Sequence, residues 1–352
     1  PTRRSSDLLN TDWYIDQMKR QAYESEPLPI SLEKEDYNFN VNGYLPFAPN
    51  PQVQNGVDLK QFVELVKQEH PALKRLSQDG RNFMTVPTKK FFLNVDKQAV
   101  LQHKVVPKER EQEIVEQLQF EISGGGMERK DLVIADILAT NNWKRPIYFS
   151  TSSSAEFLNY LRPYLQLEGL ALRVVPAKNP EPNTDAYVAR DRMHHHLMQQ
   201  FRFRNLNDPD IYYDHIYQSQ LVPAMRKNFA LLAAAHLKAG DVAKAKEVLQ
   251  FVFNKMSDDS LPFDYNTPMY VELLAKTGQE QKAQTLANIL TKRSKNAVSY
   301  YANQENPALF DREISLNMLT LQQLIMTSYA LGKQQQAAEL EQFFMQYYNL
   351  LM

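Results

Sequence analysis

The chain has no cysteine, and this absence excludes several kinds of chemistry. Without a thiol, the protein cannot form a disulfide, use a thiolate nucleophile, or hold a thiolate-rich zinc site or a cysteine-ligated cluster. The absence leaves the compartment open, because a cysteine-free chain suits the cytosol and a bacterial periplasm equally.

Excess charge and long apolar runs are also missing. The 40 basic residues are balanced by 41 acidic ones, which leaves a net charge of −1. This balance provides no overall field for nucleic acid or an anionic membrane, so we expect no nucleic-acid partner. No run approaches the roughly 18 apolar residues that cross a bilayer. The composition, 43% hydrophobic and 23% charged, is typical of a soluble globular protein, and 352 residues predict two compact units.

The first seven residues are unlike the rest of the chain. The segment Pro1–Asp7, PTRRSSD, reads as an in-frame translation of sequencing-adapter DNA, and we set it aside as an artefact. We therefore expect Leu8 to begin within a longer protein.

The first half of the chain alternates helical and strand patterns. Asp58 is a typical N-cap, and Leu59, Phe62, Val63 and Val66 follow it at helical spacing. Further helices are predicted over 12–20 and 130–141, and strands over 83–86, 91–95, 118–122, 147–151 and 170–175.

The stretch Asp131–Thr151 organises the middle of this half. We expect the core side of its helix to consist of Leu132, Ile134, Ile137 and Leu138. A turn over 141–145 follows, and Pro146 directs the chain into a strand because it cannot continue the helix.

The segment after this strand predicts a βαβ unit. Ser153 and Glu156 form a capping-box pattern at the start of a helix over 155–164. The 18 residues over 152–169 are long enough for a crossover, so the two flanking strands are predicted to be parallel, with a right-handed connection. We therefore predict an α/β domain over 8–176, with a small, partly parallel sheet and flanking helices.

The second half reads as helical hairpins after a linker over 177–189 that is rich in proline and asparagine. Gly240, Gly278 and Gly332 each have an alanine five residues later, as in the turn of a tetratricopeptide repeat. The glycines lie 38 and 54 residues apart, against about 34 in the standard repeat. We predict degenerate tetratricopeptide-like hairpins over 190–352.

One candidate ligand site lies around the predicted strand–helix junction. Backbone N–H groups at the start of a helix can hold a phosphate, and basic and aromatic side chains precede this helix. A site for an anionic or sugar-phosphate ligand would use Trp143, Lys144, Arg145, Ser152, Ser153 and Ser154. The segment has neither a glycine-rich fingerprint nor a phosphate-loop lysine, so helix capping is the favoured interpretation of the serines.

The run His194-His195-His196 does not predict a metal site. Consecutive residues on the helix expected over 190–203 point about 100° apart, so three neighbouring imidazoles cannot converge on one ion. We expect solvated or interhelical histidines instead. The sequence offers no Ser/His/Asp set or carboxylate pair, and we predict no metal and no cofactor.

Four segments of the first half resemble one known arrangement. They are LLNTDWYIDQM (8–18), PTKKFFLNVDK (87–97), DLVIADILATNNWKRPIYFS (131–150) and YLQLEGLALRVVP (164–176). The chain resembles the C-terminal region of large Bacteroidetes-type membrane proteins of unknown function. In those proteins the N-terminal half is polytopic and related to protein O-mannosyltransferases of the GT-C glycosyltransferase class.

This resemblance implies a parent protein in the inner membrane, with its catalytic half upstream of Leu8 and this region in the periplasm. The partners would be that missing transmembrane half and, through the helical repeats, a protein or glycan. The region would be an accessory module that does not catalyse. Two alternatives stay open: the α/β half is itself a ligand-binding or enzymatic domain, or the chain is a free-standing helical-repeat scaffold.

Overall fold

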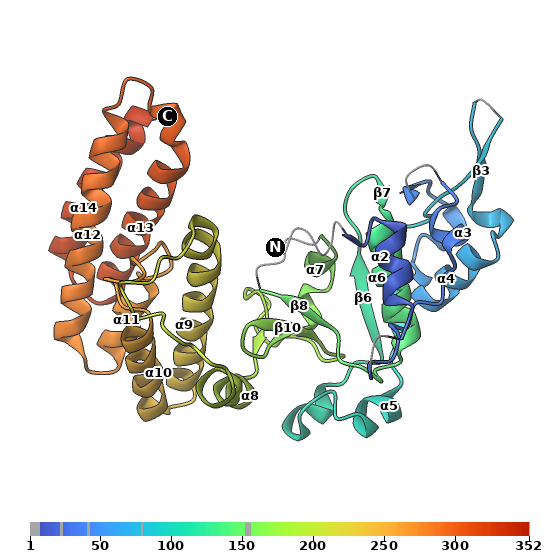
Figure 1. The fold of residues 1–352 in the computed structure, drawn as a ribbon, viewed down its shortest axis with the longest axis horizontal. Helices are drawn as coiled ribbons and strands as arrows, with labels where there is room; N and C mark the ends of the chain where they lie inside the picture. The colour runs from blue at the N-terminus through green and yellow to red at the C-terminus, as the bar shows by residue number, and fades with distance from the viewer. Residues whose placement is uncertain (1–7, 22–23, 41–42, 79, 152–155, 352) are drawn as a thin grey trace. The chain divides into compact units, whose positions relative to one another are not determined.

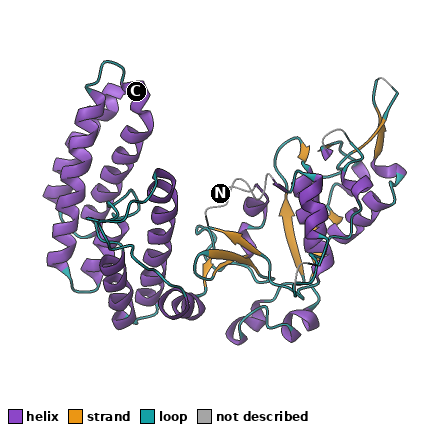
Figure 2. Ribbon diagram, viewed as in Figure 1, coloured by secondary structure: helices purple, strands orange, loops and turns teal. Residues whose placement is uncertain are grey.

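The computed structural model describes residues 8–21, 24–40, 43–78, 80–151 and 156–351. The chain forms two compact units (Figure 1). The first runs up to Leu167 and includes Ala171–Tyr187, and the second consists of Glu168–Leu170 and the chain from Val188 onward. The first unit contains small mixed sheets with helices and the second is helical (Figure 2), which confirms the predicted fold class.

The first unit is built on a three-stranded sheet with the order β2-β5-β6. Its strands are β2 (Val57–Asp58), β5 (Lys90–Asn94) and β6 (Gln117–Glu121). Strands β2 and β5 are parallel, whereas β5 and β6 are antiparallel. Phe91 on β5 stacks on Phe120 at 5.9 Å between ring centroids, so the sheet presents an aromatic face to the core.

Helix α4 (Leu59–Lys67) covers this sheet and packs against α6 (Arg129–Asn141). Asp58 accepts a hydrogen bond from the N–H of Gln61, and all four apolar residues predicted for this helix are buried. Phe62 meets Phe91 edge to face at 5.3 Å. The predicted cap and apolar stripe are therefore confirmed.

Shorter elements complete the first unit. Two small antiparallel sheets pair β1 (Leu45–Pro46) with β7 (Gly126–Met127) and β3 (Lys74–Leu76) with β4 (Asn82–Met84). Further helices here include α2 (Asp12–Met18), α3 (Lys34–Tyr37) and α5 (Lys97–Gln102). Helix α3 was not predicted, although it begins with a capping box, because the prolines and asparagines around it indicated a loop.

The buried side of α6 differs in part from the prediction. Leu132 and Leu138 are buried, but Ile134 and Ile137 remain partly exposed. A fully buried carboxylate, Asp136, lies on the same helix. The buried face of the helix is therefore wider than the predicted apolar residues indicate, and it includes a polar side chain.

The predicted parallel βαβ unit is wrong. Strand β8 (Tyr148–Ser150) does lie beside β10 (Ala171–Val174), but the two strands are antiparallel. The helix expected over 155–164 is only α7 (Glu156–Tyr160), and a 3₁₀ turn and strand β9 (Leu165–Leu167) follow it.

Strand β9 explains this reversal. It pairs antiparallel with β10 in a sheet of order β11-β9-β10-β8, whose first strand is β11 (Tyr187–Val188). The chain therefore crosses from β8 to β9, which run in the same direction, and then turns back at Gly169, where φ is +118°, into the space between them.

The second unit stacks helical hairpins. Its helices are α8 (Arg190–His195), α9 (Val222–Lys238), α10 (Val242–Lys255), α11 (Met269–Lys276), α12 (Glu280–Ala302), α13 (Asp311–Ala330) and α14 (Gln334–Leu351). The helix expected over 190–203 ends earlier, because a π-helical turn over His196–Gln200 follows α8. Among the described residues, none of the helices has the length and apolar character needed to cross a membrane.

The three predicted turns occur where the glycines lie. Gly240, Gly278 and Gly332 have φ of +79°, +72° and +73°, in the left-handed region that favours glycine. The alanines that follow each of them by five residues, Ala245, Ala283 and Ala337, are fully buried between helices. The predicted hairpin turns are therefore confirmed.

Replacing Gly240 with alanine tests this turn. A Cβ at this position would meet nothing within 4 Å, so the expected loss is purely conformational. We expect Gly240→Ala to lower the free energy of unfolding by about 1–2 kcal/mol, measured by denaturant titration followed by circular dichroism at 222 nm. Gly240→Asn, which tolerates this conformation better, should lose less. Equal losses in both variants would contradict this explanation.

Candidate functional site

The turn after α6, which carries three of the predicted ligand residues, is held rigidly. Asn142 and Trp143 have φ of 43° and 63°, both left-handed. The Asn141 side chain closes the turn, since its Nδ2 donates to the carbonyl of Arg145 at 2.7 Å and its Oδ1 accepts from the Arg145 N–H at 3.1 Å. Trp143 is only 8% exposed, so its ring belongs to the core.

The two cations of this turn already have partners. The Arg145 guanidinium donates to the carbonyls of Glu26 and Pro27 at 3.0 and 2.8 Å. Lys144 Nζ lies 3.6 Å from the Glu26 carboxylate. The turn therefore ties α6 to the segment before α3. Ser152, Ser153 and Ser154 lie outside the described residues, and a ligand site at these six positions stays a prediction.

The three consecutive histidines face different partners. His194 Nδ1 lies 3.1 Å from His236 Nε2 on α9, and His195 Nδ1 lies 2.7 Å from Gln199 Oε1. His196 Nδ1 contacts the carbonyl of Glu168 at 2.7 Å. Within the described part of the chain, no three His, Cys, Asp or Glu side chains gather as metal ligands.

His236 should make the helical unit sensitive to acid. It is fully buried, and burial, with the neighbouring His194, lowers its pKa to about 4. Because this value lies below the ordinary pKa of 6.5, the unfolded chain binds the extra proton first as the pH falls. We expect the free energy of unfolding to decrease by up to about 3 kcal/mol between pH 7 and pH 4.

The measurement is urea unfolding at several pH values. His236→Asn should flatten the pH dependence, whereas His103→Asn, at an exposed position, should keep the slope of the unmodified chain. Indistinguishable slopes for the chain and for His236→Asn would show that this imidazole does not titrate with folding.

A cavity of about 470 Å³ opens in the helical unit. We call it the α10–α12 groove, after the two helices that supply most of its lining; both can be followed in Figure 1. It is lined by Leu249, Gln250, Phe253, Asn254, Phe263, Leu274, Gln279, Gln281, Lys282, Thr285, Leu286 and Ile289. Its size falls within the range of small-ligand and side-chain pockets, about 300–1,000 Å³.

Helical spacing separates the lining into an apolar floor and a polar rim. On α10, Leu249 and Phe253 lie four residues apart on the inner side, and Gln250 and Asn254 form the next, exposed row. On α12 the buried Leu286 lies beside an exposed row of polar residues, Gln281, Lys282 and Thr285. The groove therefore offers a carbon surface between two rows of polar groups, which are neutral apart from Lys282.

Arg226 holds one wall of the groove in place. This wall is the loop between α10 and α11, which carries Phe263. The Arg226 side chain, 1% exposed, donates to the carbonyls of Leu261 and Pro262 at 2.6 and 2.9 Å and to the Asp264 carboxylate at 2.6 Å. The loop is therefore folded onto α9.

A second anchor fixes the same loop to α12. Arg293 donates to both oxygens of Asp258, at 2.8 and 2.7 Å, and Asp258 also accepts from the Phe263 N–H at 2.7 Å. Burial raises the pKa of Asp258, but these hydrogen bonds outweigh it and hold the pKa below its ordinary value. With both anchors, Phe263 is positioned before any ligand arrives, which lowers the entropy lost on binding.

The polar rim has unused hydrogen-bonding capacity. In the part of the chain that the structure describes, the side-chain amides of Gln250, Asn254 and Gln281 have no hydrogen-bond partner. The Lys282 ammonium donates to Gln279 Oε1 at 3.3 Å and has no carboxylate within ion-pair distance among those residues. The rim is thus neutral apart from one cation.

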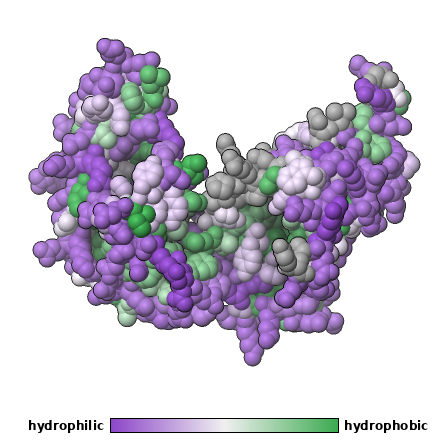
Figure 3. Space-filling view, in the orientation of Figure 1, coloured by the Kyte–Doolittle hydropathy of each residue, from purple (hydrophilic) through white to green (hydrophobic). Residues whose placement is uncertain are grey.

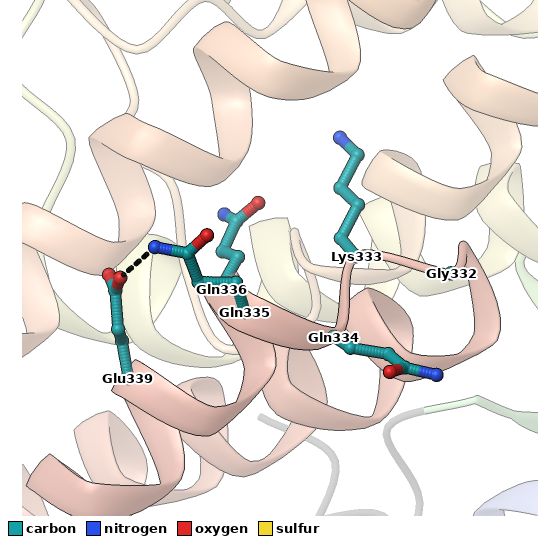
Figure 4. Close-up of a pocket in the computed structure, with 6 residues that line it drawn as sticks. All are labelled: Gly332, Lys333, Gln334, Gln335, Gln336 and Glu339. Atoms are coloured by element: carbon teal, nitrogen blue, oxygen red, sulfur yellow. Dashed lines mark hydrogen bonds between the residues drawn. The ribbon is translucent and has the colours of Figure 1, made fainter.

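A second, more open cavity of about 510 Å³ lies at the start of α14 (Figure 4). Its six lining residues are Gly332, Lys333, Gln334, Gln335, Gln336 and Glu339. Lys333 donates to Gln284 Oε1 at 2.5 Å, and Gln335 donates to Glu339 Oε1 at 3.1 Å. Because its lining has no apolar side chain, this cavity is a weaker candidate than the groove. Much of the helical surface visible in Figure 3 is similarly hydrophilic.

The first unit matches a known protein family. Residues 4–192 match the family model described as TMEM260-associated domain 2. The chain belongs to this family. No curated protein and no solved structure matches the chain.

The TMEM260-associated match has a defined end. It stops at Arg192 within α8, so it covers the α/β unit but does not reach the α10–α12 groove. The groove was not predicted from the sequence. The one available signal was the i, i+4 pairing of Gln250 with Asn254 and of Gln281 with Thr285, which reads as ordinary helix surface until α10 and α12 are brought together.

Proposed function

We propose that this chain is an accessory region of a larger membrane protein and that it binds a partner instead of catalysing a reaction. The observation that carries the proposal is the α10–α12 groove, a preformed apolar site in the helical unit. The described residues of its lining contribute carbon, amide, hydroxyl and ammonium groups without a carboxylate or imidazole, so they are suited to recognition but provide no acid–base pair. Membership in the TMEM260-associated family supports the link to a membrane protein.

The finer parts of this proposal rest on the four segments of the first unit described above. The parent protein is a glycosyltransferase-like protein of the inner membrane in Bacteroidetes, related to protein O-mannosyltransferases. Its transmembrane half carries the reaction, and this region faces the periplasm. The transmembrane half is one partner, and the acceptor protein or another ligand is the second.

A glycosyl-transfer assay tests whether this region has catalytic activity without the transmembrane half. The purified chain would be incubated with polyprenyl-phosphate mannose, with sugar nucleotides and with serine- and threonine-containing acceptor peptides. We expect product formation no faster than in the reaction without protein. Repeated turnover by this chain without a transmembrane half would contradict the proposal and favour an enzymatic α/β unit.

A further inference from the structure

We infer that the α10–α12 groove binds an extended peptide segment in which a large apolar side chain lies next to a carboxylate. This inference rests on the proposed function and names its ligand. It concerns a site outside the residues that match the family.

The floor of the groove requires an apolar anchor. The accessible apolar surface comes from Ile289 and the partly exposed Phe253 and Phe263, which lie over Leu249, Leu274 and Leu286, 0%, 2% and 4% exposed. A leucine or phenylalanine side chain that binds against this surface removes apolar area from water, which favours the complex. A sugar gains less here, because each hydroxyl placed on the apolar floor loses its water without a replacement partner. The floor therefore favours a peptide side chain over a glycan.

The rim requires an extended main chain. The free amides of Gln250 and Asn254 on one wall and Gln281 on the other each offer a donor and an acceptor, which is the complement of a peptide unit. A helical ligand already uses its main-chain groups internally. An extended segment leaves its N–H and C=O groups available to these amides.

Lys282 selects for a carboxylate. Among the described residues of the lining it is the one charged group, and it lies in the first turn of α12, where the helix dipole also favours an anion. A carboxylate next to the apolar anchor would reach this ammonium while the anchor occupies the floor. The groove is therefore suited to a peptide in which an apolar residue is followed or preceded by an acidic one.

The probe is a fluorescein-labelled dodecapeptide of glycine and serine with a central Leu-Asp pair, titrated with the full chain at low salt by fluorescence anisotropy. We expect saturable binding with Kd on the order of 100 µM. A Ser-Asp peptide should bind about tenfold more weakly. Ile289→Ser should weaken binding of the Leu-Asp peptide about fivefold, because Ile289 is 37% exposed and truncating it leaves the floor intact.

A charge swap tests the second half of the inference. Lys282→Glu should weaken the Leu-Asp peptide about 3–10-fold, and a Leu-Lys peptide should recover the lost affinity on this variant. The matched control is Lys292→Glu, at an exposed position of the same helix outside the groove, which should bind both peptides like the unmodified chain.

Three results would overturn the inference. They are the absence of saturable binding of the Leu-Asp peptide, binding that neither Ile289→Ser nor Lys282→Glu changes, and displacement of the peptide by mannotriose, which would assign the groove to glycans. None of these three results depends on whether the chain transfers a sugar. The peptide-binding inference can therefore be contradicted while the proposed non-catalytic role still holds, and the reverse is also true.

Discussion

Arg226→Met is expected to lower the free energy of unfolding of the helical unit by about 3–5 kcal/mol, because it breaks a buried charge pair. Arg226 is 1% exposed and pairs with Asp264, whose side chain is 11% exposed. The substitution preserves much of the volume but leaves that carboxylate buried without its cation. It also removes the donors to the carbonyls of Met256, Leu261 and Pro262.

The same substitution should release the wall of the groove. Amide hydrogen exchange followed by mass spectrometry should show faster exchange over 256–264, and the Leu-Asp peptide should lose affinity. The control is Arg293→Met. Its side chain is 42% exposed and pairs with Asp258, so it should lower stability by only about 0–1 kcal/mol. Equal losses for the two arginines would mean that the burial of Arg226 does not decide its contribution.

Asp136→Ala is expected to be nearly as damaging in the α/β unit. The Asp136 carboxylate is fully buried and accepts from the N–H groups of Ser31 and Leu32, at 2.6 and 2.9 Å, and from the hydroxyls of Ser31 and Thr140. Alanine would leave two main-chain donors without an acceptor, at about 1–3 kcal/mol each. We expect a total loss of about 3–5 kcal/mol.

Tryptophan fluorescence can report this loss, because both tryptophans, Trp13 and Trp143, lie in the α/β unit. Denaturant titration of Asp136→Ala should shift the fluorescence transition to lower denaturant concentration. Glu116→Ala, at an exposed loop position, should stay within about 0.5 kcal/mol of the unmodified chain. A shift of less than about 1 kcal/mol for Asp136→Ala would show that water or a local rearrangement replaces the carboxylate.

Features set by neighbours in the sequence could be predicted. Helix α4 was predicted because Asp58 and its apolar stripe act within a few residues of one another. The hairpin turns were predicted because a glycine with positive φ and an alanine five residues later act locally. Strand β10 was located from its apolar run, and its neighbour β8 was also located.

Features set by distant pairing could not be predicted. The direction of β8 against β10 depends on β9, whose three residues follow the helix predicted over 155–164 and were not predicted as a strand. The burial of Asp136 depends on Ser31 and Leu32, more than 100 residues earlier in the chain. The groove is formed by α10, α11, α12 and the two connections between them, and no single segment among them carries a motif for a ligand site.

The most direct test of the binding account is a methyl NMR titration of the full chain labelled at its isoleucine δ1 positions. Ile289 is the isoleucine that lines the groove. Addition of the Leu-Asp peptide should move the Ile289 signal in a saturable manner, with the same Kd as the anisotropy measurement, while Ile134 and Ile137 on α6 stay unchanged. Shifts confined to α6, or an unmoved Ile289 signal at saturating peptide, would contradict a binding role for the α10–α12 groove.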